Sequence, residues 1–236
     1  MGRIIYENSL ARHINTLDMR YIMETVKYIN VAIITTFVVE MKTLFKDAYW
    51  NILHAFYNNK NSPLHLRELS RLIKLNESPL TRHLNKLVKD KVLIFLKEGN
   101  MKKFCINKIF IKNIFPAYDN AKFESMLLLR KNAVKSYIEK LQNRPVFIIV
   151  FGSTAKGTFR EDSDLDIIAV FNDKVDTKKA RSYAEAQTGI TINEFQICYY
   201  EFIKELKLKE DNVIQAGIET GFPVYNNVEY YEVLYE

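Results

Sequence analysis

The stretch VFIIVFGSTAKGTFREDSDLDIIAV, from Val146 to Val170, decides the fold. Val146–Phe151 is short, unbroken and rich in β-branched and aromatic residues, which predicts a strand buried on both faces, and Gly152 ends it. A second apolar strand is predicted over Leu165–Phe171. A Gly-Ser pair therefore follows one buried strand, and two alternate aspartates begin the next.

The residues after the first strand suit a phosphate group. Gly152 has no side chain to keep a phosphate from the backbone. Ser153 is expected to cap the helical turn Thr154–Lys156 and leave free amides facing the anion. Lys156 adds a positive charge, so the sequence predicts nucleotide binding at Gly152, Ser153 and Lys156.

The two aspartates suit a divalent cation. Asp164 and Asp166 flank Leu165, and strand alternation places both carboxylates on one face, about 6.6 Å apart. Such charges repel each other unless a cation lies between them. Mg²⁺ favours carboxylates with phosphate oxygens completing its octahedron, and two such ions can clamp the attacking and leaving oxygens of an in-line displacement.

Taken separately, each half of this pattern has an ordinary structural explanation. Gly152 and Ser153 could form a plain turn, and the aspartates could be solvated residues before a strand. The complete order of strand, Gly-Ser, ten residues, Asp-x-Asp and strand is much rarer, and it favours a functional site. It is neither a Walker loop, because no Gly-Lys-Ser/Thr follows at the required spacing, nor a dinucleotide fingerprint, because only one glycine is near the turn.

The segment GSTAKGTFREDSDLD resembles the Gly-Ser, ten-residue, Asp-x-Asp signature of the DNA polymerase beta-like nucleotidyltransferases, and within them the minimal nucleotidyltransferases. The ending GFPVYNNVEYYEVL, Gly221–Leu234, is similar to the Gly-x-Pro-x-Tyr ending of such domains. The resemblance implies an α/β (α+β) fold with a small mixed β-sheet flanked by helices. It also implies ATP as substrate and two magnesium ions as cofactors.

The same resemblance implies a third carboxylate on a later strand. Thr191–Tyr199, TINEFQICY, has strand composition. Glu194 is the expected third residue, because Asn193 and Gln196 are the other polar choices and neither is anionic. Alternatively, Glu194 is a surface residue on an edge strand. The expected catalytic and metal-binding set is Asp164, Asp166 and Glu194.

The charge of the chain is unevenly distributed. The 236 residues carry a net charge of +6 and are 48% hydrophobic, which favours one or two domains. Residues 41–115 hold 15 basic and 5 acidic groups, whereas residues 116–236 hold 15 and 19. This asymmetry suggests a polyanion-binding module beside a separate domain, although a lysine-rich proteome would also raise the charge.

The basic segment has the pattern of three helices and a hairpin. The predicted helices and strands are Lys46–Asn58, His65–Leu75, Pro79 to about Lys89 with Ser78 as N-cap, Val92–Leu96 and Lys103–Asn107. This order resembles the winged helix-turn-helix domains of small prokaryotic regulators. It predicts a winged helix-turn-helix domain ahead of the nucleotidyltransferase fold.

A DNA-binding role would use the third helix and the wing. The residues expected near base edges are Thr81, Arg82, Asn85 and Lys86, and those expected at phosphates are Lys89, Lys91, Lys97, Lys102 and Lys103. DNA binding is favoured because the basic residues of this helix lie on one side. The alternative is a winged domain for dimerisation or partner docking, with solvated lysines.

The predicted domains are an N-terminal extension at residues 1–40, the winged domain at 41–115 and the nucleotidyltransferase domain at 116–236. Ile109–Asn120 is expected to be a connector, and Ala121–Gln142 one long amphipathic helix packed on the sheet. The extension is either a helix and a strand or, as we favour, sequence ahead of a start at Met41. Its apolar run Val31–Val39 is too short to span a bilayer.

Cysteine and histidine contribute no recognisable metal or disulfide pattern. Cys105 and Cys198 are far apart, and the four histidines lack ligand spacing. Together with the absence of a cleavable signal, the isolated thiols predict a cytoplasmic protein.

The expected function is magnesium-dependent transfer of a nucleoside monophosphate. The resemblance implies an antitoxin that moves AMP from ATP onto a tyrosine of a HEPN-type toxin, with the winged domain repressing its own operon. A homodimer is left open. The alternative class is a transcription regulator whose nucleotidyltransferase fold only senses nucleotide or dimerises, and tRNA ends or small antibiotics are further acceptors.

Overall fold

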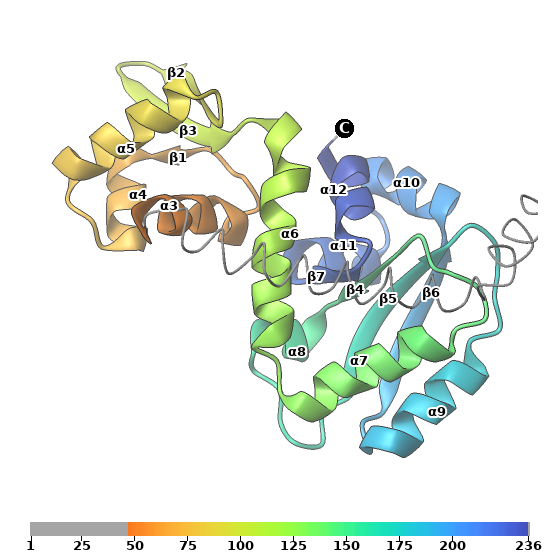
Figure 1. Ribbon diagram of the computed structural model, residues 1–236. Helices are drawn as coiled ribbons and strands as arrows, with labels where there is room; N and C mark the ends of the chain where they lie inside the picture. The colour runs from red at the N-terminus through yellow and green to blue at the C-terminus, as the bar shows by residue number, and fades with distance from the viewer. Residues whose placement is uncertain (1–46, 236) are drawn as a thin grey trace, which may run out of the picture. The chain divides into compact units, whose positions relative to one another are not determined.

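The computed structural model describes residues 47–235 (Figure 1). Predictions for residues 1–40, including Val31–Val39 and a start at Met41, lie outside the described residues. Residues Ala48–Glu236 form one compact unit. Within residues 47–235, no helix is both long enough and apolar enough to cross a membrane.

The first part of this unit is a winged helix. Its elements are α3 (Asp47–Asn58), β1 (Leu64–His65), α4 (Leu66–Ile73), α5 (Glu77–Lys89), β2 (Leu93–Glu98) and β3 (Met101–Ile106). The three strands form an antiparallel sheet in the order β1-β3-β2. Leu69, Leu80 and Leu84 are fully buried between the helices and this sheet. The predicted order of helix, turn, helix and hairpin is therefore confirmed.

Two local details of the winged helix differ from the prediction. Asn76, and not Ser78, occupies the N-cap position of α5, and its side chain makes no capping hydrogen bond. Ser78 and Pro79 lie in the first turn, where a missing backbone N–H costs no hydrogen bond. The hairpin turn has two residues because Gly99 adopts a φ of +58°, so the strands pair as far as Glu98 and Met101.

The second part is built on a mixed four-stranded sheet. Its strands are β4 (Phe147–Val150), β5 (Leu165–Phe171), β6 (Ile192–Cys198) and β7 (Phe222–Tyr225), in the order β6-β5-β4-β7. β5 and β6 are parallel, whereas β4 runs antiparallel to both β5 and β7. All four residues of β4 are fully buried, as the unbroken apolar run predicts.

Helices cover both faces of this sheet (Figure 1). α7 (Leu128–Lys140) and α9 (Lys178–Thr188) cover one face, where the residues of the shared core include Tyr137, Ile167 and Ala180. α10 (Tyr199–Leu208), α11 (Asn212–Thr220) and α12 (Asn227–Tyr235) complete the chain. α11 packs on the opposite face so closely that a Cβ on Gly217 would overlap the Ile168 side chain. The predicted small mixed sheet flanked by helices is confirmed.

The region before the sheet is arranged differently from the prediction. α6 (Lys108–Glu124) is a continuous helix across the expected connector Ile109–Asn120, with Pro116 inside it. The expected long helix Ala121–Gln142 is instead the end of α6 followed by the separate helix α7. The predicted boundary between residues 115 and 116 falls inside α6, so both parts of the unit share this helix.

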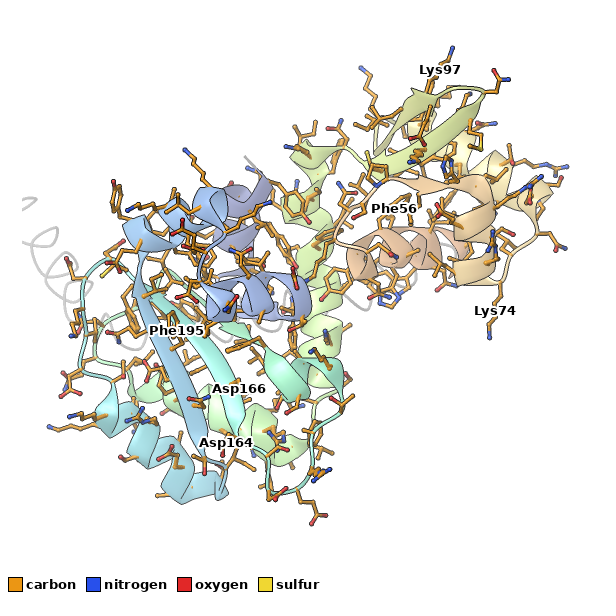
Figure 2. The ribbon with its side chains drawn as sticks, turned by 180° about the vertical axis from the view of Figure 1, so that it is seen from behind. Phe56, Lys74, Lys97, Asp164, Asp166 and Phe195 are labelled. Atoms are coloured by element: carbon orange, nitrogen blue, oxygen red, sulfur yellow. The ribbon has the colours of Figure 1, made fainter. Side chains whose placement is uncertain are left out.

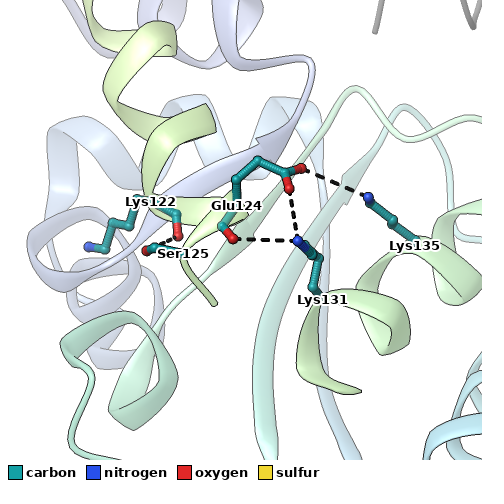
Figure 3. Close-up of polar contacts among 5 residues, drawn as sticks. All are labelled: Lys122, Glu124, Ser125, Lys131 and Lys135. Atoms are coloured by element: carbon teal, nitrogen blue, oxygen red, sulfur yellow. Dashed lines mark hydrogen bonds and ion pairs between the residues drawn. The ribbon is translucent and has the colours of Figure 1, made fainter. Parts of the chain in front are cut away.

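Polar contacts at the junction explain the break between the two helices (Figure 3). The Ser125 hydroxyl donates to the carbonyl of Lys122 at 2.7 Å, which ends α6. Lys131 Nζ reaches back to the Glu124 carboxylate at 2.8 Å, and Lys135 lies 3.9 Å from the same carboxylate. The pairing holds the start of α7 against the end of α6.

A buried carboxylate on α6 joins three helices. Asp119 is fully buried, and its Oδ1 accepts hydrogen bonds from the hydroxyls of Tyr57 on α3, at 2.8 Å, and Tyr231 on α12, at 2.9 Å. Asn227 donates to Oδ2 at 3.3 Å. Burial raises the pKa of Asp119 to about 7, although these hydrogen bonds and the charge of Lys60 oppose the shift.

This shift predicts a pH-dependent stability. The pKa of Asp119 rises from 3.8 in an exposed carboxyl to about 7 in the fold, so the folded state binds the proton more tightly. The contribution of protonated Asp119 to the free energy of unfolding is therefore complete below about pH 4 and is lost as the pH rises towards 7. The free energy of unfolding changes by at most about 1.4 kcal/mol per pH unit for this group. Asp119→Asn should remove this slope from the free energy of unfolding measured in urea between pH 4 and 7.

The exposed carboxyl of Asp173 provides a matched control. Asp173→Asn should leave the slope unchanged. An Asp119→Asn protein with the same pH slope as wild type would contradict the assignment.

Candidate functional site

The Gly-Ser turn and the two aspartates meet at one end of β4 and β5. The Phe151 amide donates to the carbonyl of Asp166 at 3.1 Å, which extends the antiparallel pairing beyond β4. Gly152 then turns with a φ of +65°, and a Cβ added to it would overlap Oδ2 of Asp166. Only glycine satisfies both requirements, because it accepts the left-handed conformation and leaves room for the carboxylate.

An open pocket lies beside this turn. It has a volume of about 500 Å³, and its lining residues are Ser153, Thr158, Arg160, Asp162, Ser163, Asp164 and Asp166. Asp164 and Asp166 both lie at the start of β5 (Figure 2). The structure therefore brings together four of the residues singled out from the sequence: Gly152, Ser153, Asp164 and Asp166.

The other phosphate-binding predictions need adjustment. Ser153 lies within the short helix α8 (Gly152–Lys156), and Phe151 occupies its N-cap position. Ser153 therefore lines the pocket without capping the helix. Lys156 is exposed at the end of α8 and does not line the pocket. Arg160, in the loop that follows, is the basic residue of the pocket wall.

Glu194 does not join the two aspartates, so its predicted place beside them is wrong. In the parallel pairing of β5 and β6 it is in register with Ile167, whose side chain belongs to the core under α7 and α9. Its Oε2 accepts a hydrogen bond from the Thr177 hydroxyl at 2.7 Å, and Oε1 is buried. Because successive side chains of a strand alternate between faces, Glu194 lies on the opposite face of the sheet from Asp166.

Asn193 occupies the position that the prediction gave to a carboxylate. It is in register with Asp166, and its Nδ2 donates to Asp166 Oδ1 at 2.9 Å. The neighbour of the aspartates on β6 is therefore an uncharged amide.

Arg130 is a residue that the sequence did not single out. It is buried in the first turn of α7, with only 2% of its surface exposed. Its guanidinium donates to the Thr154 hydroxyl at 2.9 Å and to the carbonyls of Arg160, Ser163 and Asp164 at 3.1, 2.6 and 3.2 Å. One side chain thus fixes α8 to the loop that carries Asp164. Burial lowers its pKa, while the two site aspartates oppose that shift.

The two aspartates suit a divalent cation only together with ligands from a bound nucleotide. Two carboxylates together with phosphate oxygens are a ligand set that Mg²⁺ favours. Across residues 47–235, however, no group of three or more His, Cys, Asp and Glu side chains could hold a metal ion. The expected third ligand, Glu194, lies on the other face of the sheet, and the third acidic residue of the pocket wall is Asp162. Cys105 and Cys198 are free thiols.

The predicted DNA-binding residues form an exposed surface on the winged helix. Thr81, Arg82, Asn85, Lys86 and Lys89 are exposed on α5, on the side away from its buried leucines. The exposed residues beyond this helix are Lys91, Lys97 and Lys102.

Acidic residues pair with some of these cations. Lys86 pairs with Asp90 at 3.0 Å. Lys103 is half-buried and pairs with Glu98 at 2.6 Å. The positive surface is therefore partly balanced by acidic partners.

Comparison with known proteins agrees with the geometry of the second part. Residues 131–233 match the family described as "Nucleotidyltransferase domain". This segment is therefore similar to nucleotidyltransferase domains. It contains the Gly-Ser turn, both site aspartates and the whole four-stranded sheet.

Other comparisons are less informative. A solved structure, described as "The structure of a MarR family protein from Bacillus stearothermophilus", is 13% identical and covers 46% of this chain and 79% of its own, with a TM-score of 0.32. At this level the similarity says nothing about what the winged helix binds. No curated protein matches the sequence significantly.

The close approach of Gly152 to Asp166 gives a direct test. Gly152→Ala should displace the Asp166 carboxylate, lower the affinity for Mg·ATP by 100-fold or more and destabilise the fold by about 2 kcal/mol. Gly157→Ala is the matched control, because Gly157 also has a positive φ, of +70°, but open space around it. It should cost about 1 kcal/mol and leave Mg·ATP affinity nearly unchanged.

Isothermal titration calorimetry and urea unfolding measure these two quantities. Equal loss of affinity in both variants would show that backbone strain, and not the carboxylate, determines binding.

Arg130 predicts a second effect on the same pocket. Arg130→Lys keeps the charge but cannot make four hydrogen bonds in a fork, so the loop with Asp164 should loosen. We expect Mg·ATP affinity to fall by about tenfold and the protein to lose roughly 2 kcal/mol of stability. Lys135→Arg, an exposed exchange on the same helix, is the control. Unchanged digestion of the loop by trypsin after Arg160 would contradict the role given to Arg130.

Proposed function

We propose that the nucleotidyltransferase domain binds Mg·ATP and transfers AMP to a hydroxyl group of a protein. The observation that carries this proposal is the packing of Gly152 against the Asp166 carboxylate at the rim of an open pocket. That contact brings a backbone suited to phosphate next to carboxylates suited to a divalent cation.

Different residues of the site would bind the phosphates and the magnesium ion. The Gly152 and Ser153 turn faces the β and γ phosphates, and Arg160 supplies the positive charge first assigned to Lys156. Asp164 and Asp166 would hold the magnesium, which neutralises phosphate charge and orients the α phosphate. Arg130 positions the loop from its far side.

The reaction is an in-line displacement. The acceptor oxygen forms a bond to the α phosphorus, the bond from that phosphorus to the oxygen bridging to the β phosphate breaks, and diphosphate leaves. The hydroxyl proton passes to a carboxylate of the site. Preorganised charge and positioning would supply most of the acceleration.

We propose a tyrosine of a HEPN-type toxin as the acceptor, which would make the protein an antitoxin. This part of the proposal rests on the resemblance of GSTAKGTFREDSDLD to the minimal nucleotidyltransferases. The open, polar pocket supports it, because a tyrosine on another protein needs an unobstructed approach. Transfer RNA ends and small antibiotics are the competing acceptors.

The winged helix would bind the DNA upstream of the protein's own gene. The exposed side of α5, with Arg82, Asn85 and Lys86, suits the major groove, and the lysines of the wing suit phosphates. Binding there would let the protein repress its own operon.

A second candidate is a regulator that binds nucleotide without transferring it. The observation that favours it is the amide of Asn193 beside Asp166, where a third carboxylate would assist the chemistry.

Transfer is tested with ATP labelled at the α phosphate, magnesium and a co-purified HEPN-type protein. Wild type should label the protein on tyrosine, and Asp166→Asn should reduce labelling by 100-fold or more, because one of two metal-binding charges is lost. Asp162→Asn, which alters an acidic residue of the same pocket wall outside the Asp-x-Asp pair, is the control. Nucleotide binding with no label in any acceptor would support the regulator instead.

DNA binding is tested by fluorescence anisotropy with the upstream DNA of the gene. The double change Arg82→Ala and Lys86→Ala should weaken binding at least tenfold and reduce its salt dependence. Lys204→Ala and Lys207→Ala remove equal charge from exposed positions on α10 and should have little effect. If both double variants bind like wild type, the winged helix has a docking role.

A further inference from the structure

Asn193 changes the charge balance of the nucleotide site. In-register residues of parallel strands direct their side chains to the same face, so Asn193 and Asp166 lie together, and a hydrogen bond of 2.9 Å joins them. The carboxylate of the neighbouring residue, Glu194, is committed to Thr177 on the opposite face. Beside Asp164 and Asp166, strand β6 therefore contributes an amide and no carboxylate, and the third carboxylate of the pocket wall, Asp162, comes from the loop before β5.

The amide also occupies part of Asp166. A carboxylate that bridges two metal ions uses both of its oxygens, and the Asn193 N–H takes one of the two lone pairs of Oδ1, which leaves this oxygen less negative towards a cation. Arg130 adds a buried positive charge whose field reaches both Asp164 and Asp166. Two divalent cations beside Asp164 and Asp166 would thus have a guanidinium nearby and an amide in place of a carboxylate on β6, so their charge would be compensated poorly.

We propose that Asn193 limits this site to a single divalent ion, the one that arrives bound to the nucleotide, and so makes it a slow transferase that keeps Mg·ATP bound. This inference rests on the proposed function, because it concerns the same pocket and the same nucleotide. Asp164, Asp166 and the phosphate oxygens would together hold the single ion. For an ion on the acceptor side, β6 offers the amide of Asn193 and no anionic ligand.

The consequence lies in the acceptor hydroxyl. Without a second ion to lower its pKa, the hydroxyl must lose its proton to a carboxylate during the attack on the α phosphorus. The same bonds form and break as in a two-ion site, and diphosphate still leaves. Binding of Mg·ATP is therefore retained while the transfer step is slowed.

The test counts metal ions with Mn²⁺ and the α,β-methylene analogue of ATP, which cannot be cleaved at the α phosphate. Electron paramagnetic resonance of free Mn²⁺ gives the number bound per chain. Wild type should bind one ion in the presence of the analogue, and Asn193→Asp should bind two. Asn172→Asp makes the same exchange at an exposed residue beyond the far end of β5 and should bind one.

Thermal unfolding provides a second readout. Without metal, Asn193→Asp should unfold at a lower temperature than wild type, because three carboxylates then repel one another, and Mn²⁺ should raise its unfolding temperature more than that of wild type. If the variant folds and a HEPN-type acceptor is labelled, its labelling rate should rise at least tenfold.

The outcomes separate this inference from the proposed function. Two ions bound by wild type, or one ion bound by a folded Asn193→Asp protein, would overturn the role of Asn193 while leaving Mg·ATP binding intact. Failure of wild type to bind the analogue at all would overturn the proposed function itself. The wild-type count needs no variant, so it decides the question even if Asn193→Asp does not fold.

Discussion

The contact between Gly152 and the Asp166 carboxylate is the constraint on which the rest of the site depends. The antiparallel pairing of β4 with β5 brings the end of one strand beside the start of the other, and a glycine lets the carboxylate approach the turning backbone. Ser153, Asp164 and Asp166 then line one pocket. A larger residue at position 152 would displace the Asp166 carboxylate from the turn.

Two buried polar residues fix the elements around that contact through hydrogen bonds. Arg130 joins α8, through the Thr154 hydroxyl, to the loop before β5, through carbonyls 30 to 34 residues away in sequence. Asp119 lies on the helix shared by both parts of the unit. Its carboxylate accepts hydrogen bonds from a tyrosine hydroxyl on α3 of the winged helix and from another on α12. Both side chains are buried away from water, so their hydrogen bonds must come from protein groups. Each therefore favours the one arrangement of neighbours that supplies these partners. These hydrogen bonds give the winged helix and the part built on the four-stranded sheet a common structural support.

Local signals in the sequence predicted strands β2 to β6, the Gly-Ser turn and the two aspartates, because each depends on neighbouring residues, whereas the short strands β1 and β7 were not predicted. The prediction that Glu194 joins the aspartates was wrong because neighbouring residues of β6 point to opposite faces of the sheet. Composition alone could not show whether Glu194 or Asn193 lies on the face of Asp166. The predictions that Ser153 and Ser78 are N-cap residues were wrong because backbone geometry, which the residue type does not fix, decides where a helix begins. Arg130 could not be predicted, since its partners come together only in the folded chain.

The most direct test is a crystal structure with Mn²⁺ and the α,β-methylene analogue of ATP, recorded at a wavelength where manganese scatters anomalously. The account predicts one anomalous peak in contact with Asp164 and Asp166, with the analogue's triphosphate against Gly152 and Ser153. A triphosphate bound elsewhere on the protein, or manganese that contacts neither aspartate, would contradict it.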